Sequence, residues 1–455
     1  MNWLTGIDQQ WAWQTYRPSD EVKWDESTAA HLFRRAGFGV DLPTLKNASK
    51  RDPQDVVDEL VSNNQEPNEF SRIADSLART VLAGGDPMKL SSAWVYRLLF
   101  TPSQLLEKLT LFWHGHFATG AEKVADAAMM WNQNRLLRRH AMGDFRALTQ
   151  GIAKDPAMLI YLDSASNRKA HPNENFAREL MELFCLGEGN YSETDVLELA
   201  RCFTGWEIRN DRFRKNRYQQ DRGRKSVLEQ SGAFDGEEAI DIVLQRDEMP
   251  LFICRKLFRY FICDEPSPPD ELLAEPARVF RESGLQIAPL ARFMLSSNLF
   301  FSHYSRARKI KSPVELIVGC LRGLEGTTSS GEVAQGLRSI GQGLFYPPNV
   351  KGWDGGRTWI NSSTLLGRSN LFEKILSSSE TKFGGVSMAE YLGKFDITTA
   401  DDALKYFETC FMAISIDKTS RRQLLAPFES SAELDDQSVR QLFHRVASLP
   451  EFQLA

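Results

Sequence analysis

The chain lacks the features that mark several large classes of protein. No run of about 18 apolar residues occurs anywhere along it, so the sequence predicts no membrane-spanning helix. The N-terminus has no basic stretch followed by an apolar one, which is the pattern of a secretory signal peptide. A cytoplasmic location is therefore the default expectation.

The sequence has few cysteines and lacks several familiar catalytic motifs. The six cysteines form no C-x-x-C pair, and Cys185, Cys202 and Cys254 lie within apolar helical patterns. Such spacing is typical of buried thiols in a reduced protein, not of disulfides or zinc ligands. The sequence has no internal repeat, and it lacks the motifs G-x-G-x-x-G, G-K-[ST], H-E-x-x-H and G-x-S-x-G.

A large basic excess is also absent. The formal net charge is −5, which argues against a protein that covers nucleic acid. One run, 209–225, is strongly basic and contains aromatic residues, a composition that can bind RNA or another polyanion. We favour a solvated loop or β-hairpin there because the rest of the chain is acidic, and nucleic acid is not an expected partner.

Apolar residues recur at helical spacing along most of the chain, and no buried Val/Ile runs alternate with these segments. The sequence therefore predicts a mainly α fold, a single large multi-helix globular domain over 25–455. Little β-structure is expected beyond a short hairpin near 209–230 and short pieces around 345–360. Residues 1–24 are expected to form an irregular N-terminal arm, and the prolines at 266–269 mark a candidate soft boundary near 264–270.

The stretch 163–206 has the clearest pattern. A helix is predicted over 173–186, closed by a left-handed Gly187, and a second helix begins at the S-x-x-D capping box of Ser192 and Asp195. The apolar stripe of the first helix consists of Phe176, Leu180, Leu183 and Phe184. Its polar stripe consists of Asn175, Arg178, Glu179 and Glu182. This polar stripe is either a solvated face with ion pairs or one wall of a binding site.

These segments carry a family resemblance. The runs PNENFARELMELFCLG and YSETDVLELARCFTGW resemble the bacterial domain-of-unknown-function 1800 family. Further matching segments are AAHLFRRAGFG at 29–39, LFWHGHFAT at 111–119, MGDFRALTQGIAKDPAMLIYLD at 142–163, RKLFRYFI at 255–262 and FYPPNVKGWDGGRTWINSSTLLGRSN at 345–370. The resemblance implies a helical fold and a set of signature residues, but no reaction. Some relatives look exported.

The sequence departs from that family at two positions. Relatives often carry histidine where this chain has Phe184, and many have a His-Asp pair where Gln220 precedes Asp221. A scheme in which those two histidines are essential ligands is therefore in doubt for this protein.

The tripeptide His114-Gly115-His116 ends a predicted apolar helix. Two histidines two positions apart cannot share one helical face, but they can converge if the chain leaves the helix at Gly115. A converging pair suits a divalent metal or acid/base chemistry, with Asp163 as a candidate third metal ligand. Alternatively, one histidine caps the helix while the other packs inside. Asp163, Asn173 and Asn175 could likewise cap helix ends or bind a hard cation.

The run 345–361 is rich in glycine, proline and tryptophan, so it is predicted to be an ordered loop. Tryptophan together with charged side chains suits a sugar or another polar ring. Its candidate substrate-binding residues are Lys351, Trp353, Asp354 and Arg357. A structural cap over the helices is the alternative interpretation.

Two functions follow from these patterns. The first is an enzyme for a polar small molecule, a saccharide or a phosphorylated compound, acting by hydrolysis or transfer with or without a metal. Its catalytic candidates are His114, His116, Arg178, Glu179 and Glu182, with Asn173 and Asn175 binding substrate. The second is a non-catalytic scaffold or binding protein, in which the same side chains form a buried structural network.

Overall fold

Helices account for most of the structure of residues 3–428 and 434–455, the part of the chain that the computed structural model describes. The α-helices of the first part are α1 (Gln9–Trp13), α2 (Glu26–Ala36), α3 (Leu42–Ala48), α4 (Pro53–Ser62), α5 (Asn68–Ala83), α6 (Pro87–Phe100), α7 (Gln104–His116), α8 (Ala121–Val124), α9 (Ala127–His140), α10 (Phe145–Ala153) and α11 (Pro156–Tyr161). This confirms the mainly α-helical fold predicted from the spacing of apolar residues.

The second part of the chain continues in the same style. Its helices are α12 (Asn175–Glu179), α13 (Glu193–Cys202), α14 (Gly236–Gln245), α15 (Glu248–Phe261), α16 (Asp270–Glu282), α17 (Ile287–Leu295), α18 (Asn298–Phe301), α19 (Pro313–Gly323), α20 (Ser330–Ser339), α21 (Ser362–Ser377), α22 (Met388–Gly393), α23 (Ala400–Phe411), α24 (Lys418–Leu425) and α25 (Asp436–Ala447). Among the described helices, none has the length and apolar character needed to cross a bilayer.

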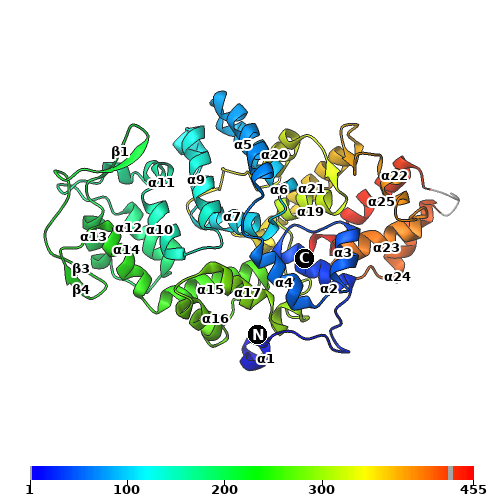
Figure 1. Ribbon diagram of the computed structural model, residues 1–455, viewed down its shortest axis with the longest axis horizontal. Helices are drawn as coiled ribbons and strands as arrows, with labels where there is room; N and C mark the ends of the chain where they lie inside the picture. Colours follow the sequence, from blue (N-terminus) through cyan, green and yellow to red (C-terminus); the bar gives the residue numbers. More distant parts are fainter. Residues whose placement is uncertain (1–2, 429–433) are drawn as a thin grey trace.

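The helices are arranged along an elongated body (Figure 1). Helices α13 and α14 lie at one end with the small β-hairpins, and α22 to α25 lie at the other end. Helices α6, α7, α15 and α19 occupy the middle of the body. Segments from both halves of the sequence therefore meet at the centre.

The β-structure consists of small two-stranded antiparallel sheets. Strands β1 (Trp206–Arg209) and β2 (Arg212–Lys215) form one hairpin, and β3 (Lys225–Val227) and β4 (Gln230–Gly232) form a second. The single hairpin expected near 209–230 is thus two consecutive hairpins. Strands β5 (Gly326–Thr327) and β6 (Lys382–Phe383) also pair. In the described chain no strand falls within 345–360, where adjacent prolines remove backbone donors.

The N-terminal segment is more ordered than predicted. It contains a 3₁₀ turn (Trp3–Gly6) and α1, and it packs on the body through buried Trp13, whose indole N–H donates to the carbonyl oxygen of Leu272 at 2.7 Å. One hydrophobic cluster includes both Phe261 and Leu272, on either side of 264–270. The soft boundary at that place stays a prediction.

The central helix changes its winding half-way along. Residues 175–179 are α-helical, but Leu180–Cys185 are π-helical, which the sequence pattern did not indicate. The backbone N–H groups of Leu186 and Gly187 both bond to the carbonyl oxygen of Met181, at 2.8 and 3.0 Å. Gly187 has a φ of 85°, the left-handed conformation that was predicted. This ending leaves the carbonyl oxygens of Leu183 and Phe184 available to side chains.

The capping box at the start of α13 is present as predicted. The backbone N–H of Asp195 donates to Ser192 Oγ at 3.2 Å, and the backbone N–H of Ser192 donates to the Asp195 carboxylate at 2.9 Å. We expect Ser192→Ala to lower the free energy of unfolding by about 1 kcal/mol, measured by urea denaturation. Ser76→Ala, an exposed change in the middle of α5, is the control and should cost less than about 0.5 kcal/mol. Equal losses in both variants would contradict a capping role.

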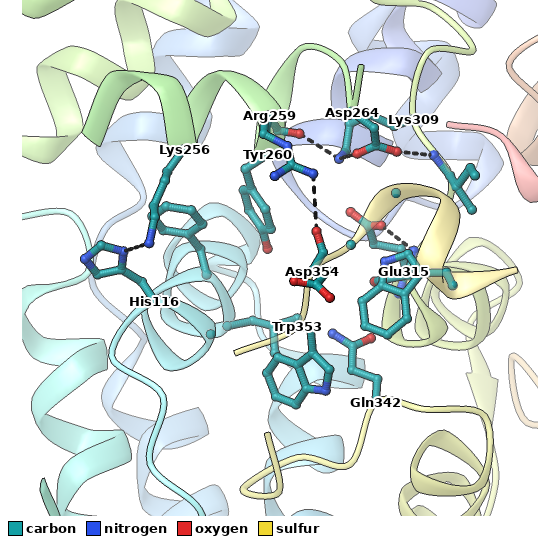
Figure 2. Close-up of a pocket in the computed structure, with 18 of the residues that line it drawn as sticks. His116, Lys256, Arg259, Tyr260, Asp264, Lys309, Glu315, Gln342, Trp353 and Asp354 are labelled. Atoms are coloured by element: carbon teal, nitrogen blue, oxygen red, sulfur yellow. Dashed lines mark hydrogen bonds and ion pairs between the residues drawn. The ribbon is translucent and has the colours of Figure 1, made fainter. Parts of the chain in front are cut away.

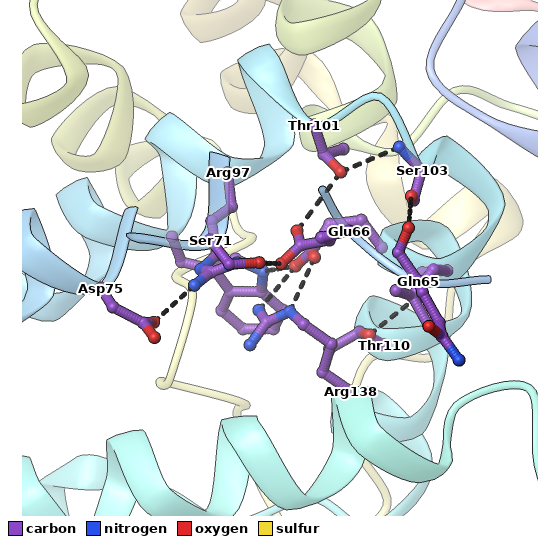
Figure 3. A network of polar contacts seen from close by, with 12 residues as sticks. Gln65, Glu66, Ser71, Asp75, Arg97, Thr101, Ser103, Thr110 and Arg138 are labelled. Atoms are coloured by element: carbon purple, nitrogen blue, oxygen red, sulfur yellow. Dashed lines mark hydrogen bonds and ion pairs between the residues drawn. The ribbon is translucent and has the colours of Figure 1, made fainter. Parts of the chain in front are cut away.

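A buried charged network fixes the position of α7 (Figure 3). The Glu107 carboxylate accepts two bonds from Arg138 of α9, both at 2.8 Å. Nearby, Arg97 of α6 pairs with Asp75 of α5 at 2.6 Å and with Glu66 of the connector before α5. These contacts join four helices through charged groups that are buried except for Asp75, whose side chain is 38% exposed. They therefore define which face of α7 points to which neighbour.

Candidate functional site

A cavity of about 240 Å³ lies between α7 and α15, and Figure 2 shows it from close by. It is enclosed by the end of α7, the face of α15 that points to it, the segment 309–315 and the loop 342–359. Its charged lining residues are Lys256, Arg259, Asp264, Lys309, Glu315, Lys351 and Asp354. Its ring-bearing lining residues are Phe112, His116, Tyr260, Trp353 and Trp359. We call it the α7–α15 cavity.

Glycines bring the loop 342–359 directly onto α7. Gly352 has a φ of 77°, and a Cβ atom there would lie 2.0 Å from the carbonyl oxygen of Gly115. A Cβ atom on Gly115 would in turn lie 3.5 Å from the ring of Trp353. The two glycines therefore permit a backbone contact that builds one wall of the cavity. Helix α7 continues through His116, so the chain does not leave the helix at Gly115, which was the condition for the two histidines to converge.

Lys256 and His116 form a hydrogen-bonded pair on one side of the cavity (Figure 2). The Lys256 Nζ donates to the carbonyl oxygen of Leu183 at 2.8 Å and lies 3.2 Å from His116 Nδ1. The His116 Nε2 lies 3.0 Å from the carbonyl oxygen of Phe184. Since a carbonyl oxygen only accepts, the ring proton is assigned to Nε2, and Nδ1 accepts from Lys256.

The surroundings of this pair lower the pKa of both groups. Burial and the positive charge of Lys256 lower the pKa of His116 well below its ordinary value, so the ring is neutral at physiological pH. Burial also lowers the pKa of Lys256 to about 8. No carboxylate in the described residues forms an ion pair with Lys256, and its Nζ lies 4.8 Å from the centroid of the Phe252 ring.

Charges on the opposite side of the cavity are neutralised within the protein. Lys309 Nζ pairs with Asp264 at 2.6 Å, and Lys108 Nζ pairs with Glu315 at 2.6 Å. Both pairs are almost fully buried. They hold α7, α19 and the end of α15 together, and they leave little net charge for a ligand to use.

Two further cations lie at the mouth. Arg259 and Lys351 are exposed, and neither makes an ion pair with a described carboxylate. Among the described residues, the Arg259 side chain donates to the backbone oxygen of Asp354, at 3.3 Å. With the buried pairs set aside, the cavity presents the three cations Lys256, Arg259 and Lys351 against the single carboxylate of Asp354. Its field therefore favours an anion.

Neutral donors complete the lining. The Trp353 indole N–H is buried and has no hydrogen-bond partner among the described residues. The side-chain oxygen of Gln342 accepts from the backbone N–H of Val314 at 2.9 Å, so its amide NH₂ is the group that remains for a ligand. Figure 2 shows both side chains next to each other at the edge of the cavity.

The two predicted histidines do not converge. His114 packs edge-on against Trp94 with ring centroids 5.1 Å apart, and its Nε2 accepts from the backbone N–H of Phe345 at 3.2 Å. Burial lowers its pKa to about 3, so it is a neutral core residue. Residues two apart on a continuous helix point about 200° apart, which is why only His116 reaches the cavity.

The predicted loop residues divide into two groups. Lys351, Trp353 and Asp354 line the cavity, and their role in substrate binding stays a prediction. Arg357 lies outside it, with 83% of its side chain exposed, and pairs with Glu265 at 3.0 Å.

The polar stripe of the central helix lies mainly outside the cavity. Arg178 makes two bonds to Glu193 at 2.8 and 2.7 Å, an exposed contact between α12 and α13. Glu182 accepts from the Tyr191 hydroxyl at 2.9 Å. Burial and the charge of Glu182 raise the pKa of Glu179, whereas the charge of Lys351 lowers it, which places Glu179 close to the loop.

The predicted asparagines stabilise the entry to the central helix. The side chain of Asn173 donates to the carbonyl oxygen of Asp163 at 3.1 Å and accepts from the backbone N–H of Asn175 at 3.0 Å. Asn175 donates to the carbonyl oxygen of Leu162 at 3.3 Å. These bonds match the helix-capping alternative.

The predicted metal site is not assembled. Asp163 is exposed and pairs with Lys123 at 2.7 Å, while His114 Nε2 and both ring nitrogens of His116 are engaged in hydrogen bonds. Over residues 3–428 and 434–455, no three His, Cys, Asp or Glu side chains are grouped so that they could hold a metal ion. The structure thus does not bring Asp163 together with the two histidines.

Sequence reasoning missed most of the charged lining. Lys256, Arg259 and Tyr260 follow the spacing i, i+3, i+4, so they share one face of α15, and this signal was available. Asp264, Lys309 and Glu315 come from segments far apart in the chain, and no local pattern predicts their proximity.

The comparisons with known proteins identify the family. The family model described as "Protein of unknown function (DUF1800)" matches residues 31–454, nearly the whole chain. The protein therefore belongs to this helical family, as its sequence motifs suggested. Neither the curated proteins nor the solved structures contain a significant match.

Proposed function

We propose that this protein is an enzyme that binds a small anionic, hydroxyl-bearing compound, such as a phosphorylated or carboxylated sugar, in the α7–α15 cavity. The observation that supports this most is the charge of the cavity. Lys256, Arg259 and Lys351 line it without an ion-pair partner among the described carboxylates. Lys256 lies inside the cavity, where a cation attracts an anion more strongly than at the surface, and the exposed Arg259 and Lys351 add their charges at the mouth.

The lining suggests how such a ligand would be held. Arg259 and Lys351 would bind the anionic group at the mouth, and the Trp353 and Trp359 rings would contact the face of a sugar. Asp354 and the Gln342 amide would bond to its hydroxyl groups. Deeper in the cavity, Lys256 has a pKa of about 8 and can give or take a proton near neutral pH, as hydrolysis or group transfer requires.

Isothermal titration calorimetry with glucose 6-phosphate, gluconate and uncharged glucose tests this proposal. We expect both anions to bind and glucose to bind more weakly. Arg259→Met should raise the Kd of the anions about tenfold to a hundredfold, because hydrogen bonds to charged groups contribute about 1.5–3 kcal/mol. Phosphorus NMR of the glucose 6-phosphate samples would then show whether the phosphoryl group is released or transferred.

The matched control is Lys46→Met, which removes an exposed cation from α3 and should leave the Kd unchanged. A failure of both anions to bind would contradict the proposal and favour the non-catalytic scaffold. That alternative has its own support, because the Glu107–Arg138 and Lys108–Glu315 pairs are satisfied without any ligand. A scaffold would not require an accessible cavity with unpaired cations, so this feature favours the enzyme.

A further inference from the structure

We propose that Lys256 is a nucleophilic amine that forms an imine with an aldehyde or ketone bound in the α7–α15 cavity. The ligand class is then narrower than an anionic sugar: it is an anionic carbonyl compound, such as a keto or aldehydo sugar phosphate or a keto acid. This inference rests on the proposed function, because it places the ligand in the same cavity.

The hydrogen bonds of Lys256 orient its lone pair. A neutral amine has two N–H groups and one lone pair. Its two neighbours, the carbonyl oxygen of Leu183 at 2.8 Å and His116 Nδ1 at 3.2 Å, are both acceptors. The His116 Nδ1 can only accept in this arrangement because Nε2 donates to the carbonyl oxygen of Phe184. Both N–H groups are thereby engaged, and the lone pair must point away from these two acceptors.

The surroundings also keep the amine reactive. The buried lysines Lys108 and Lys309 each have a carboxylate partner at 2.6 Å, Glu315 and Asp264 respectively. Lys256 has no such partner in the described chain; the titratable groups nearest to it are His116 of α7, Arg259 of α15 and Cys185 of the π-helical segment. With a pKa of about 8, about a tenth of the amine is neutral at pH 7.

The reaction balances without a co-reactant. The Lys256 nitrogen attacks the carbonyl carbon, the carbonyl π electrons move to oxygen, and a proton passes from nitrogen to that oxygen to give a carbinolamine. Loss of one water molecule then gives the C=N bond. The net change is amine plus carbonyl to imine plus water, with no oxidation or reduction. Arg259 and Lys351 would hold the anionic group while this occurs.

Borohydride trapping tests the inference directly. The full-length protein is incubated with dihydroxyacetone phosphate at about pH 7.5 and reduced with sodium cyanoborohydride, and the adducts are mapped by peptide mass spectrometry. An ordinary lysine has a pKa of about 10.4 and is almost wholly protonated at this pH. We therefore expect Lys256 to be labelled at least about tenfold faster than the exposed lysines Lys351 and Lys46. Lys256→Arg should remove this adduct alone.

Labelling of the wild type as a function of pH keeps the test informative even if the variant does not fold. Half-maximal labelling of Lys256 near pH 8 is expected. Labelling of Lys256 no faster than that of Lys351 would overturn the inference.

A carbonyl-free analogue separates the two proposals. Glycerol 3-phosphate cannot form an imine, so its binding, measured by calorimetry, tests only the anion site. If glycerol 3-phosphate binds but dihydroxyacetone phosphate gives no Lys256 adduct, the imine is overturned and the proposed function stands. A Lys256 adduct without binding of the analogue would support the imine and contradict the proposed anion site.

Discussion

Replacing Glu107 by alanine is expected to lower the free energy of unfolding by about 3–5 kcal/mol, because it leaves a buried arginine without its counter-charge. The Glu107 side chain is fully buried, and its two oxygens accept bonds from Arg138 at 2.8 Å each. The indole of Trp94 donates to the same carboxylate. Burial raises the pKa of Glu107, but the charges of Arg138 and Arg97 and the hydrogen bonds from Arg138 and Trp94 together bring it below its ordinary value, so the group remains ionised.

Urea denaturation at neutral pH measures this effect. Glu107→Ala combined with Arg138→Met should recover part of the loss, because no uncompensated charge then remains. The matched control is Arg278→Ala, which removes exposed ion pairs to Glu275 and Glu282 and should cost less than about 1 kcal/mol. A loss below about 1 kcal/mol for Glu107→Ala would show that the network carries no special stability.

Replacing Glu315 by glutamine is expected to have a similar effect, about 3–5 kcal/mol, and a distinct pH dependence. The change keeps the shape of the side chain but leaves the fully buried ammonium of Lys108 unpaired. Burial raises the pKa of Glu315, yet the nearby charges of Lys108 and Lys309 bring it down to about 2. The pair therefore contributes stability that is fully present above about pH 4.5 and is lost as the pH falls towards about 2.

Urea denaturation of the wild type and of Glu315→Gln over a pH series tests whether this stability is lost as the pH falls. The difference in stability between them should be constant at neutral pH and shrink below about pH 4.5, where Glu315 binds a proton in the unfolded wild type but remains ionised in the folded protein. Glu332→Gln, which breaks an exposed contact to Lys374 at 3.4 Å, is the control and should show no comparable pH dependence. A difference that stays constant down to about pH 3 would contradict the role assigned to this pair.

The fold was largely predictable because its determinants are local. Apolar spacing, a glycine at position 187 and the Ser192–Asp195 box act within a few residues of the chain, and each appears in the structure as expected. The winding of Leu180–Cys185 was not predictable in this way. A π-helical turn depends on tertiary packing, and its side-chain pattern differs little from that of an α-helix.

The candidate site was predictable only in part. His116, Lys351, Trp353 and Asp354 were named from their motifs and do line the cavity. Arg178 and Glu182 of the central helix were also named as catalytic candidates. In the structure Arg178 bonds to Glu193 of α13, and Glu182 accepts from Tyr191, just before α13. A polar stripe on one helix cannot reveal which neighbouring segment will supply its partners.

The π-helical segment has a consequence for how the chain tolerates insertions and deletions. In a regular α-helix the carbonyl oxygen of Leu183 would accept from the backbone N–H of Gly187, but here that N–H bonds to Met181 at 3.0 Å. The wide π-helical turn thus leaves the carbonyl oxygen of Leu183 without a helical partner, and this oxygen accepts a hydrogen bond from Lys256 instead. A π-helical turn holds one residue more than an α-helical turn. Deleting a single residue between 180 and 185 would tighten the turn, withdraw that acceptor and rotate the hairpin beyond it. The exact number of residues in this segment therefore helps to determine the position of the Lys256 amine.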